Sequence, residues 1–240
     1  MEPLLTEQFV AARKELTAYV CRLVIRPQLA EDLVQSTYLR CLEAKDRLPT
    51  SVDGIRGWLF KVASNLAFDE LRRHGHWREH MLTDLRDAAI ADRAFVQQSL
   101  AMAETPETKA IAREHVVACV ACTMRNLPEQ KAAALLLVEV HGFSVDEAAD
   151  LLEATVGQTK NWLQEGRAHM LRRYDATCAL ISKTGVCHQC EELDEFMRAH
   201  QGRPLPDGAT LDHRLALVRT HREVPWSGWH RIMLERIPSV

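Results

Sequence analysis

Glycine and proline are scarce in this sequence, at 10 and 9 of its 240 residues. Both residues are typical of the tight turns that join short strands. Runs in which apolar and polar residues alternate, the pattern of half-buried strands, are missing as well. The sequence therefore predicts an all-α protein, and its length leaves room for one to three small domains.

Long apolar runs are also missing, since none approaches the roughly 20 residues of a membrane-spanning helix. The first residues, MEPLLTEQF, are interrupted by polar side chains and carry no basic leader of the kind found in signal peptides. We therefore expect a cytoplasmic protein that has no membrane partner.

Patterns of catalytic residues are lacking too. We find no glycine-rich phosphate loop, no nucleophile–base pair and no carboxylate dyad with supporting context, so we do not expect an enzyme. The formal net charge of −3 differs from that of a protein that coats nucleic acid. Any surface that binds nucleic acid must therefore be local, with acidic residues elsewhere.

The most informative pattern lies in residues 127–174. An apolar run at helical spacing predicts a helix that Gly142 ends, and Ser144 with Glu147 three residues later forms a capping box for a short second helix. Thr155 is the expected cap of a longer third helix. A short helix, a tight turn and a longer helix form a helix-turn-helix, whose second helix enters the DNA major groove.

The first turns of the longer helix carry polar side chains where a recognition helix contacts base edges, namely Gln158, Thr159, Lys160 and Asn161. Basic residues that could hold phosphates follow along the same helix, namely Arg167, Arg172 and Arg173. An ordinary helical hairpin with a solvated polar face would have the same pattern. The residues alone leave both interpretations open.

This segment resembles region 4 of bacterial sigma factors. The shared pattern is G-x-S-x-x-E-x-A followed by G-x-x-K and a later arginine, and it matches Gly142, Ser144, Glu147, Ala149, Gly157, Lys160 and Arg167. Asn161 and Trp162 stand where Ser-Arg is more usual. The resemblance therefore implies promoter recognition with an atypical preferred sequence.

Three amphipathic helices are expected before this segment, over residues 6–23, 28–44 and 55–74. The second and third resemble region 2 of extracytoplasmic-function sigma factors. The first matching block is Ala30, Glu31, Asp32, Leu33, Val34, Gln35, Thr37, Leu39 and Arg40. The second block is Trp58, Leu59, Ala63, Asn65, Asp69, Leu71, Arg72 and Arg73.

The resemblance implies two partners, core RNA polymerase and promoter DNA. The second helix would dock on the polymerase clamp through Glu31, Asp32 and Gln35. The third helix would capture the melted minus-ten strand, with implied contacts from Trp58, Lys61, Asn65, Arg72 and Arg73. Asn65 is the candidate for holding a flipped base. The helix-turn-helix would read the minus-thirty-five element through Gln158, Thr159, Lys160, Asn161 and Arg167.

These resemblances predict four parts of the chain. They are a region 2-like domain over residues 1–77, a linker over 78–106, a helix-turn-helix domain over 107–175 and a C-terminal extension over 176–240. Within the extension we expect short helices near residues 192–200, 210–221 and 225–237.

Seven cysteines without an export signal suggest reduced thiols or metal ligands instead of disulfides. Cys119 and Cys122 form one CxxC before the helix-turn-helix, and Cys187 and Cys190 form another after it. Two such pairs are the usual arrangement of a tetrahedral Zn²⁺ site with four thiolate ligands. A zinc ion held by both pairs would fix the C-terminal extension to the helix-turn-helix domain.

Other interpretations of the cysteines stay open. Cys119 and Cys122 could be small buried hydrophobic residues, and Cys187 with Cys190 could be a redox pair. Cys178 or His188 could replace one thiolate. Two single cysteines, Cys21 and Cys41, are expected to be packing residues.

The C-terminal extension resembles cysteine-bearing extensions of some extracytoplasmic-function sigma factors, which are linked to metal or redox control. A regulatory partner such as an anti-sigma protein is a further expectation. Two other functions compete with the sigma interpretation. One is a regulator that binds duplex DNA through the helix-turn-helix alone, for which the block from Trp58 to Arg73 would be superfluous. The other is a metal or thiol sensor whose sigma-like domains are only a scaffold.

Overall fold

The computed structural model describes residues 2–24, 26–74, 124, 127–177 and 211–224. Every regular element in these ranges is a helix and none is a strand, which confirms the all-α prediction. None of the helices in the described ranges has the length and apolar character needed to cross a membrane.

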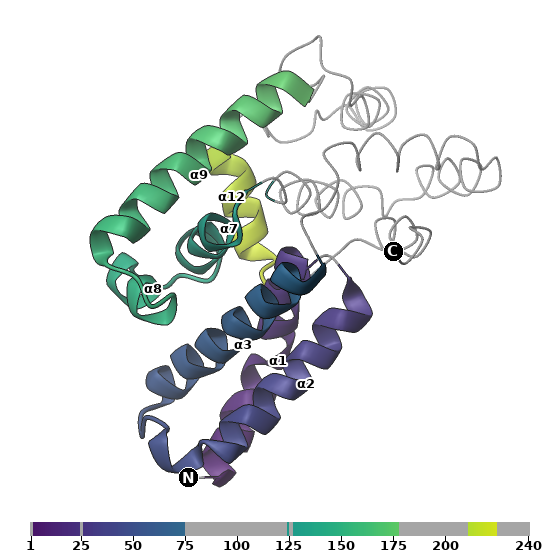
Figure 1. Cartoon of the computed structure of the whole chain (residues 1–240), viewed down its shortest axis with the longest axis vertical. Helices are drawn as coiled ribbons and strands as arrows, with labels where there is room; N and C mark the ends of the chain where they lie inside the picture. Colours follow the sequence, from purple (N-terminus) through teal and green to yellow (C-terminus); the bar gives the residue numbers. More distant parts are fainter. Residues whose placement is uncertain (1, 25, 75–123, 125–126, 178–210, 225–240) are drawn as a thin grey trace, which may run out of the picture. The chain divides into compact units, whose positions relative to one another are not determined.

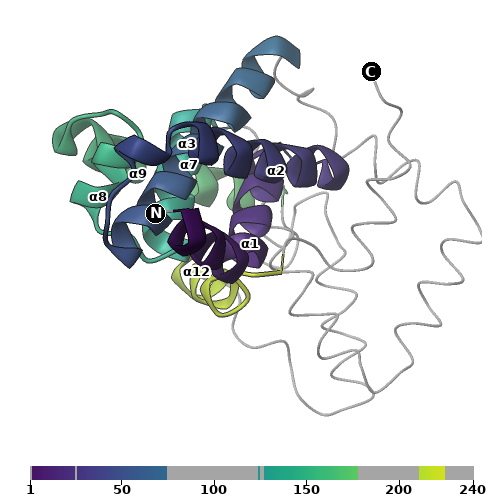
Figure 2. The ribbon, with the colours of Figure 1, turned by 90° about the horizontal axis from the view of Figure 1, so that it is seen from below.

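The first three helices pack against one another, as Figures 1 and 2 show from two directions. They are α1 (Glu2–Val24), α2 (Pro27–Glu43) and α3 (Val52–His74). Pro27 begins α2, a position where the missing N–H of proline costs nothing. A single 3-10 turn, Lys45–Arg47, follows α2.

The core of this three-helix group is formed by apolar stripes at helical spacing. Leu16 and Val20 of α1 are fully buried, as are Leu59 and Phe60 of α3. The hydroxyl groups of Tyr19 and Ser64 lie 2.7 Å apart in this core and satisfy each other. Both hydroxyl groups are therefore buried with a hydrogen-bond partner.

Helix α3 begins three residues before the predicted position because Ser51 caps it. The Ser51 hydroxyl accepts a hydrogen bond from the Gly54 N–H at 3.1 Å, and the Ser51 carbonyl accepts one from Ile55. Gly54 is required for close packing, since a Cβ there would lie 2.5 Å from the Pro49 Cβ.

The helix-turn-helix follows its predicted outline. Helix α7 (Glu129–Leu135) continues into a π-helical segment, Leu136–Val140, which Gly142 ends at a φ of +75°. The π-segment widens the helix by one residue, so the His141 N–H bonds the Leu136 carbonyl. This widening was not predicted.

Both later helices of the motif have the caps that the sequence predicts. Ser144 and Glu147 form a reciprocal capping box at the start of α8 (Val145–Leu151). Thr155 and Gln158 form a similar pair at the start of α9 (Val156–Thr177), with hydrogen bonds of 3.1 and 3.2 Å. These caps fix where the recognition helix begins.

Residues 1–76, 127–166 and 221–225 form one compact unit. The described parts of a second unit are Met124, the C-terminal part of α9 and α12 (Leu211–Thr220). The buried residues of α12 are those that its spacing predicts, namely Leu211, Leu215 and Val218. Most of the predicted domain boundaries fall outside the described residues, and they remain predictions.

Candidate functional site

The residues expected to bind polymerase lie on the exposed side of α2. Glu31, Asp32 and Gln35 are all exposed, whereas Leu33 and Val34 between them are buried. Leu39 lies one turn beyond Gln35 and is 58% exposed. This face therefore combines two carboxylates and an amide with an apolar side chain.

Three of the residues expected to hold the melted strand share one side of α3, because they are spaced by three and four positions. Asn65 is exposed, and Trp58 is half-buried with its indole Nε1 buried and without a hydrogen-bond partner. Lys61 Nζ lies 2.9 Å from Glu153 Oε1, in the turn that precedes α9.

The two arginines at the end of α3 are exposed and paired within the helix. Arg72 Nη2 lies 2.5 Å from Asp69 Oδ1, and Arg73 Nη1 lies 3.8 Å from Glu70 Oε2. Exposed pairs of this kind contribute little stability, so little is lost when another anion takes the place of the carboxylate. A nucleic-acid phosphate could therefore replace either carboxylate.

The start of α9 exposes only part of the predicted base-reading set. Lys160 and Asn161 are exposed. Gln158 is exposed too, but its Oε1 accepts the Thr155 N–H and hydroxyl, so this oxygen serves the helix cap. Lys160, Asn161 and the free amide nitrogen of Gln158 are the groups that remain for base edges.

Thr159 is a correction to the predicted set. Its side chain is completely buried, and its hydroxyl donates to the Thr155 carbonyl at 3.1 Å. The helical period explains this placement, because consecutive residues are about 100° apart around the axis, so Thr159 faces the packed interior while Lys160 faces solvent. In this arrangement the Thr159 side chain is not accessible to a base edge.

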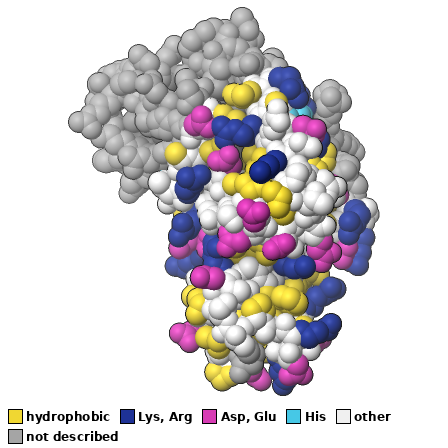
Figure 3. All heavy atoms as spheres, turned by 90° about the vertical axis from the view of Figure 1, so that its left-hand side faces the viewer, with side chains coloured by type: hydrophobic (Ala, Val, Ile, Leu, Met, Phe, Trp, Pro, Cys, Tyr) yellow, Lys and Arg dark blue, Asp and Glu magenta, His cyan; other side chains and the backbone are white. Residues whose placement is uncertain are grey.

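Arg167, expected to hold a phosphate, is half-buried, and its guanidinium pairs with Asp212 of α12. Charge on the surface is mixed in sign, since acidic and basic side chains are interspersed on the face drawn in Figure 3. This mixture agrees with the small net charge of −3.

The four cysteines of the expected zinc site, Cys119, Cys122, Cys187 and Cys190, lie outside the described residues, as do Cys178 and His188. Within the described ranges, no cluster of three or more His, Cys, Asp or Glu side chains is arranged to hold a metal. Cys21 and Cys41 are buried, which confirms their prediction as packing residues. Burial raises the pKa of the Cys41 thiol to about 12, so this thiol is inert.

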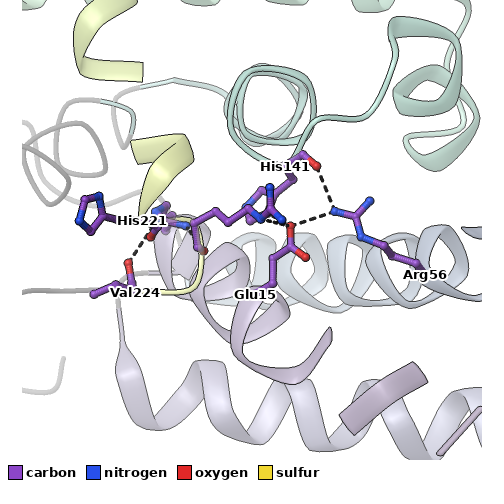
Figure 4. A network of polar contacts seen from close by, with 7 residues as sticks. Glu15, Arg56, His141, His221 and Val224 are labelled. Carbon is purple, nitrogen blue, oxygen red and sulfur yellow. Dashed lines mark hydrogen bonds and ion pairs between the residues drawn. The ribbon is translucent and has the colours of Figure 1, made fainter. Parts of the chain in front are cut away.

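A cluster of polar side chains around Glu15, drawn in Figure 4, was not predicted from the sequence. Glu15 Oε1 lies 2.9 Å from Arg56 Nη2, 3.0 Å from His141 Nδ1 and 3.5 Å from Arg222 Nε. We call these four residues the Glu15 cluster. It joins α1, α3, the end of the π-helical segment and the turn after α12.

Electrostatics fix the protonation of this cluster. Burial raises the pKa of Glu15, but the His141 hydrogen bond and the Arg56 charge outweigh burial and hold that pKa at about 2. Burial lowers the pKa of His141 to about 4, although Glu15 opposes this shift. His141 is therefore neutral at pH 7, and its Nδ1–H donates to the carboxylate, which can only accept.

Arg22 is a second buried charge beside this cluster. It is only 1% exposed, and burial lowers its pKa to about 10, so it stays cationic. Its guanidinium donates to the carbonyls of His221, Arg222 and Val224 at 2.8–3.1 Å. These carbonyls lie in the turn that follows the last residue of α12.

One signal in the sequence could have indicated these contacts. Glu15 and Arg22 lie on the apolar stripe of α1, seven residues apart, between positions that are buried. A charged residue on such a stripe needs a buried partner. The identity of the partner could not be read from the sequence, because Arg56, His141 and Arg222 come from distant segments.

Comparisons with known proteins match both halves of the described chain. The family model described as Sigma-70 region 2 matches residues 9–76, and that described as Sigma-70, region 4 matches residues 118–170. Together the two matches cover about half of the chain. The first comprises most of α1 and all of α2 and α3, and the second includes α7, α8 and most of α9.

Individual relatives agree with these matches. The ECF RNA polymerase sigma factor SigE of Mycolicibacterium smegmatis is 27% identical over 146 residues, which are 60% of this chain and 51% of SigE. The RNA polymerase sigma-H factor of Pseudomonas aeruginosa is 25% identical over 64% of this chain and 77% of its own. The ECF RNA polymerase sigma factor EcfG of Rhodopseudomonas palustris is 26% identical over 69% and 82%. The match thus spans about half the length of the first of these relatives and about four fifths of the other two.

Proposed function

Because this chain belongs to the extracytoplasmic-function group of the sigma-70 family, we propose that it is a promoter-specificity subunit of bacterial RNA polymerase. It binds core polymerase in the cytoplasm and directs transcription initiation to promoters with matching minus-ten and minus-thirty-five elements. One observation carries this proposal, namely that region 2 and region 4 both occur in one chain and in that order.

Polymerase binding is assigned to α2. The exposure of Glu31, Asp32 and Gln35 on one side of this helix supports the assignment. Acidic side chains on such a face select a basic partner surface and speed the encounter with it. Leu39 adds apolar area that polymerase would cover.

Promoter reading is divided between two helices. Asn65 of α3 is exposed and has the donor and acceptor groups that recognise the edge of a flipped base. Lys160 and Asn161 occupy the exposed first turns of α9, where a recognition helix contacts bases in the major groove. The arginines Arg72 and Arg73 are placed to hold single-stranded backbone.

Regulation is assigned to the C-terminal extension. Two contacts support this part of the proposal, namely the Asp212–Arg167 pair and the hydrogen bonds from Arg22 to residues 221–224. A Zn²⁺ ion on Cys119, Cys122, Cys187 and Cys190 would supply the signal input, because thiolate ligands respond to oxidants and soft metals. An anti-sigma protein is an alternative source of the same control.

Transcription with purified core polymerase tests the proposed function. Promoters are first selected from genomic fragments, and run-off transcripts are then compared with and without this chain. We expect specific transcripts that depend on both promoter elements. A chain that binds the selected duplex and yet never supports initiation would be a helix-turn-helix regulator, and this result would contradict the sigma assignment.

A further inference from the structure

Region 2 and region 4 touch through the side of α3 that is assigned to the melted strand. Lys61 of α3 pairs with Glu153 in the turn of the helix-turn-helix at 2.9 Å. One turn earlier, Gly57 lies so close to α8 that an added Cβ would contact Leu151 at 3.6 Å. Helix α3, which is expected to bind the melted strand, is thus partly covered by the helix-turn-helix, which is expected to bind the minus-thirty-five element.

Aromatic and cationic side chains extend this contact. The rings of Phe60 and Phe143 meet edge to face with centroids 5.1 Å apart. The Arg56 guanidinium lies over the Phe143 ring at 4.3 Å, and it also donates to the His141 carbonyl at 3.0 Å. Arg56 therefore contacts region 4 both as a hydrogen-bond donor and through a cation–π interaction.

The Glu15 cluster is part of this contact (Figure 4). Glu15 is one carboxylate that serves both regions, because it accepts from Arg56 of region 2 and from His141 of region 4. His141 is 2% exposed, and its ring also packs edge-on against Tyr19 at 5.4 Å. Separation of the two regions would expose this ring and break the hydrogen bonds from His141 to Glu15 and from Arg56 to the His141 carbonyl.

The turn at residues 221–224 closes the other side of the cluster. Arg222 contributes a second guanidinium to Glu15, and three backbone carbonyls of this turn accept from Arg22. This turn belongs to the C-terminal extension, beyond both sigma regions. The extension therefore contributes directly to the same contact.

This arrangement conflicts with simultaneous reading of two promoter elements. The minus-ten and minus-thirty-five elements are about 25 base pairs apart, or roughly 85 Å at 3.4 Å per base pair. The ion pair between Lys61 and Glu153 joins α3 to the turn that directly precedes the recognition helix α9. No promoter can reach both helices in that state unless the regions separate.

We infer that the described arrangement is a closed, self-inhibited state of the chain, in which the Glu15 cluster and the turn at residues 221–224 hold region 4 against the strand-binding side of α3. Opening must precede promoter reading, and the C-terminal extension controls it by releasing or retaining this turn. The inhibitory consequence rests on the proposed function, whereas the closed state itself can be tested without polymerase or DNA.

Zero-length carbodiimide cross-linking tests the closed state directly, because it joins a lysine amine to a carboxylate only when the two are in contact. The chain offers a matched internal control. Lys131 and Glu165 lie 2.5 Å apart inside region 4, and their exposure resembles that of Lys61 and Glu153. Peptide mass spectrometry of the free protein should find both cross-links. If only the control pair is joined, the closed state does not exist in solution.

Glu15→Gln tests the cluster. It keeps the shape of the side chain but leaves two guanidinium groups without their carboxylate, and we expect the closed-to-open equilibrium constant to fall by about 100-fold. The Lys61–Glu153 cross-link should then weaken relative to the control cross-link, which stays unchanged. Glu7→Gln, an exposed position on the same helix, should change neither. An unchanged ratio in Glu15→Gln would overturn the role of the cluster.

A milder variant guards against a folding defect in Glu15→Gln. Arg222→Ala removes an exposed side chain and only one contact to Glu15, so the helices should stay intact by circular dichroism. We expect a smaller drop in the same cross-link ratio, in the same direction. If the cross-link ratio does not drop in Arg222→Ala, the C-terminal extension does not help to hold the closed state.

The last test uses binding to a promoter. In a complex with core polymerase and promoter duplex, the Lys61–Glu153 cross-link should disappear while the Lys131–Glu165 cross-link remains. Persistence of both in an actively transcribing complex would overturn the inference. If the chain forms no promoter complex but the cross-link ratio responds to Glu15→Gln, the proposed function fails and the closed state stands.

Discussion

His141 and Glu15 form a hydrogen-bonded pair whose members lose their stabilising effect in different pH ranges. His141 has a pKa of about 4 in the folded chain and about 6.5 when exposed, so the unfolded chain binds an extra proton between these values. Stability from this group is complete above pH 6.5 and falls as the pH drops toward 4. Glu15, with a pKa of about 2, loses its contribution only at lower pH.

We therefore predict that the free energy of unfolding decreases between pH 6.5 and 4 with a slope of about 1.4 kcal/mol per pH unit from His141. Urea unfolding at a series of pH values measures it. The control is His141→Gln, whose amide can still donate to Glu15 but does not titrate. The difference between the two proteins isolates His141 from the other histidines. Equal pH profiles would mean that His141 is already charged, or solvated, in the folded chain.

At the same scale, Lys160 tests promoter reading. Its side chain is exposed in the first turns of α9, so Lys160→Ala should weaken binding to the upstream element. If the ammonium holds a phosphate, the slope of log affinity against log salt should fall by about one. If it reads a base, the loss should fall mainly on the preferred sequence. Lys14→Ala, exposed on α1, is the control. If Lys160→Ala shows neither of these effects, Lys160 is not part of the surface that binds DNA.

At the scale of single elements, the sequence predicted most of what local chemistry decides. The capping box of Ser144 and Glu147, the helix end at Gly142 and the cap at Thr155 all depend on residues within a few positions of one another. The π-helical segment after α7 was missed because its extra residue adds no local signal to an apolar run. Thr159 was misplaced because the base-reading set was taken from consecutive positions, without regard to the helical period.

Helix α2 carries the prediction that belongs to this scale. Asp32→Arg combined with Gln35→Ala reverses charge on the exposed side of α2 without touching its buried residues. We expect affinity for core polymerase to fall at least about tenfold, or 1.4 kcal/mol, because opposed charges become like charges. Fluorescence anisotropy with labelled chain measures the affinity. Asp46→Arg, exposed in the 3-10 turn after α2, is the charge-matched control. A loss shared by both variants would point to general electrostatics instead of a docking face.

At the scale of the whole molecule, the sequence predicted the family and the order of its regions but not the contact between them. Glu15, Arg56, His141 and Arg222 are separated by up to about two hundred positions, and nothing local marks them as partners. From the sequence alone, each of these residues could equally be a solvated polar residue on the surface. Motif matching finds residues that act on an outside partner, whereas contacts that the chain makes with itself depend on tertiary packing.

The cysteines carry the last prediction at this scale. Two CxxC pairs on either side of the helix-turn-helix are expected to bind one Zn²⁺ ion per chain with four thiolates at about 2.3 Å. Cys187→Ser with Cys190→Ser should release the metal, change transcription and leave most helical content intact, because both positions lie beyond the sigma regions. Cys178→Ser should leave the metal in place if Cys178 is not a ligand. Elemental analysis of protein purified without chelator measures the stoichiometry, and thiol titration measures the free cysteines. Metal-free protein with Cys119, Cys122, Cys187 and Cys190 all freely titratable would exclude zinc. Control of the sigma regions would then depend on a redox pair or on the contacts of residues 221–224 alone.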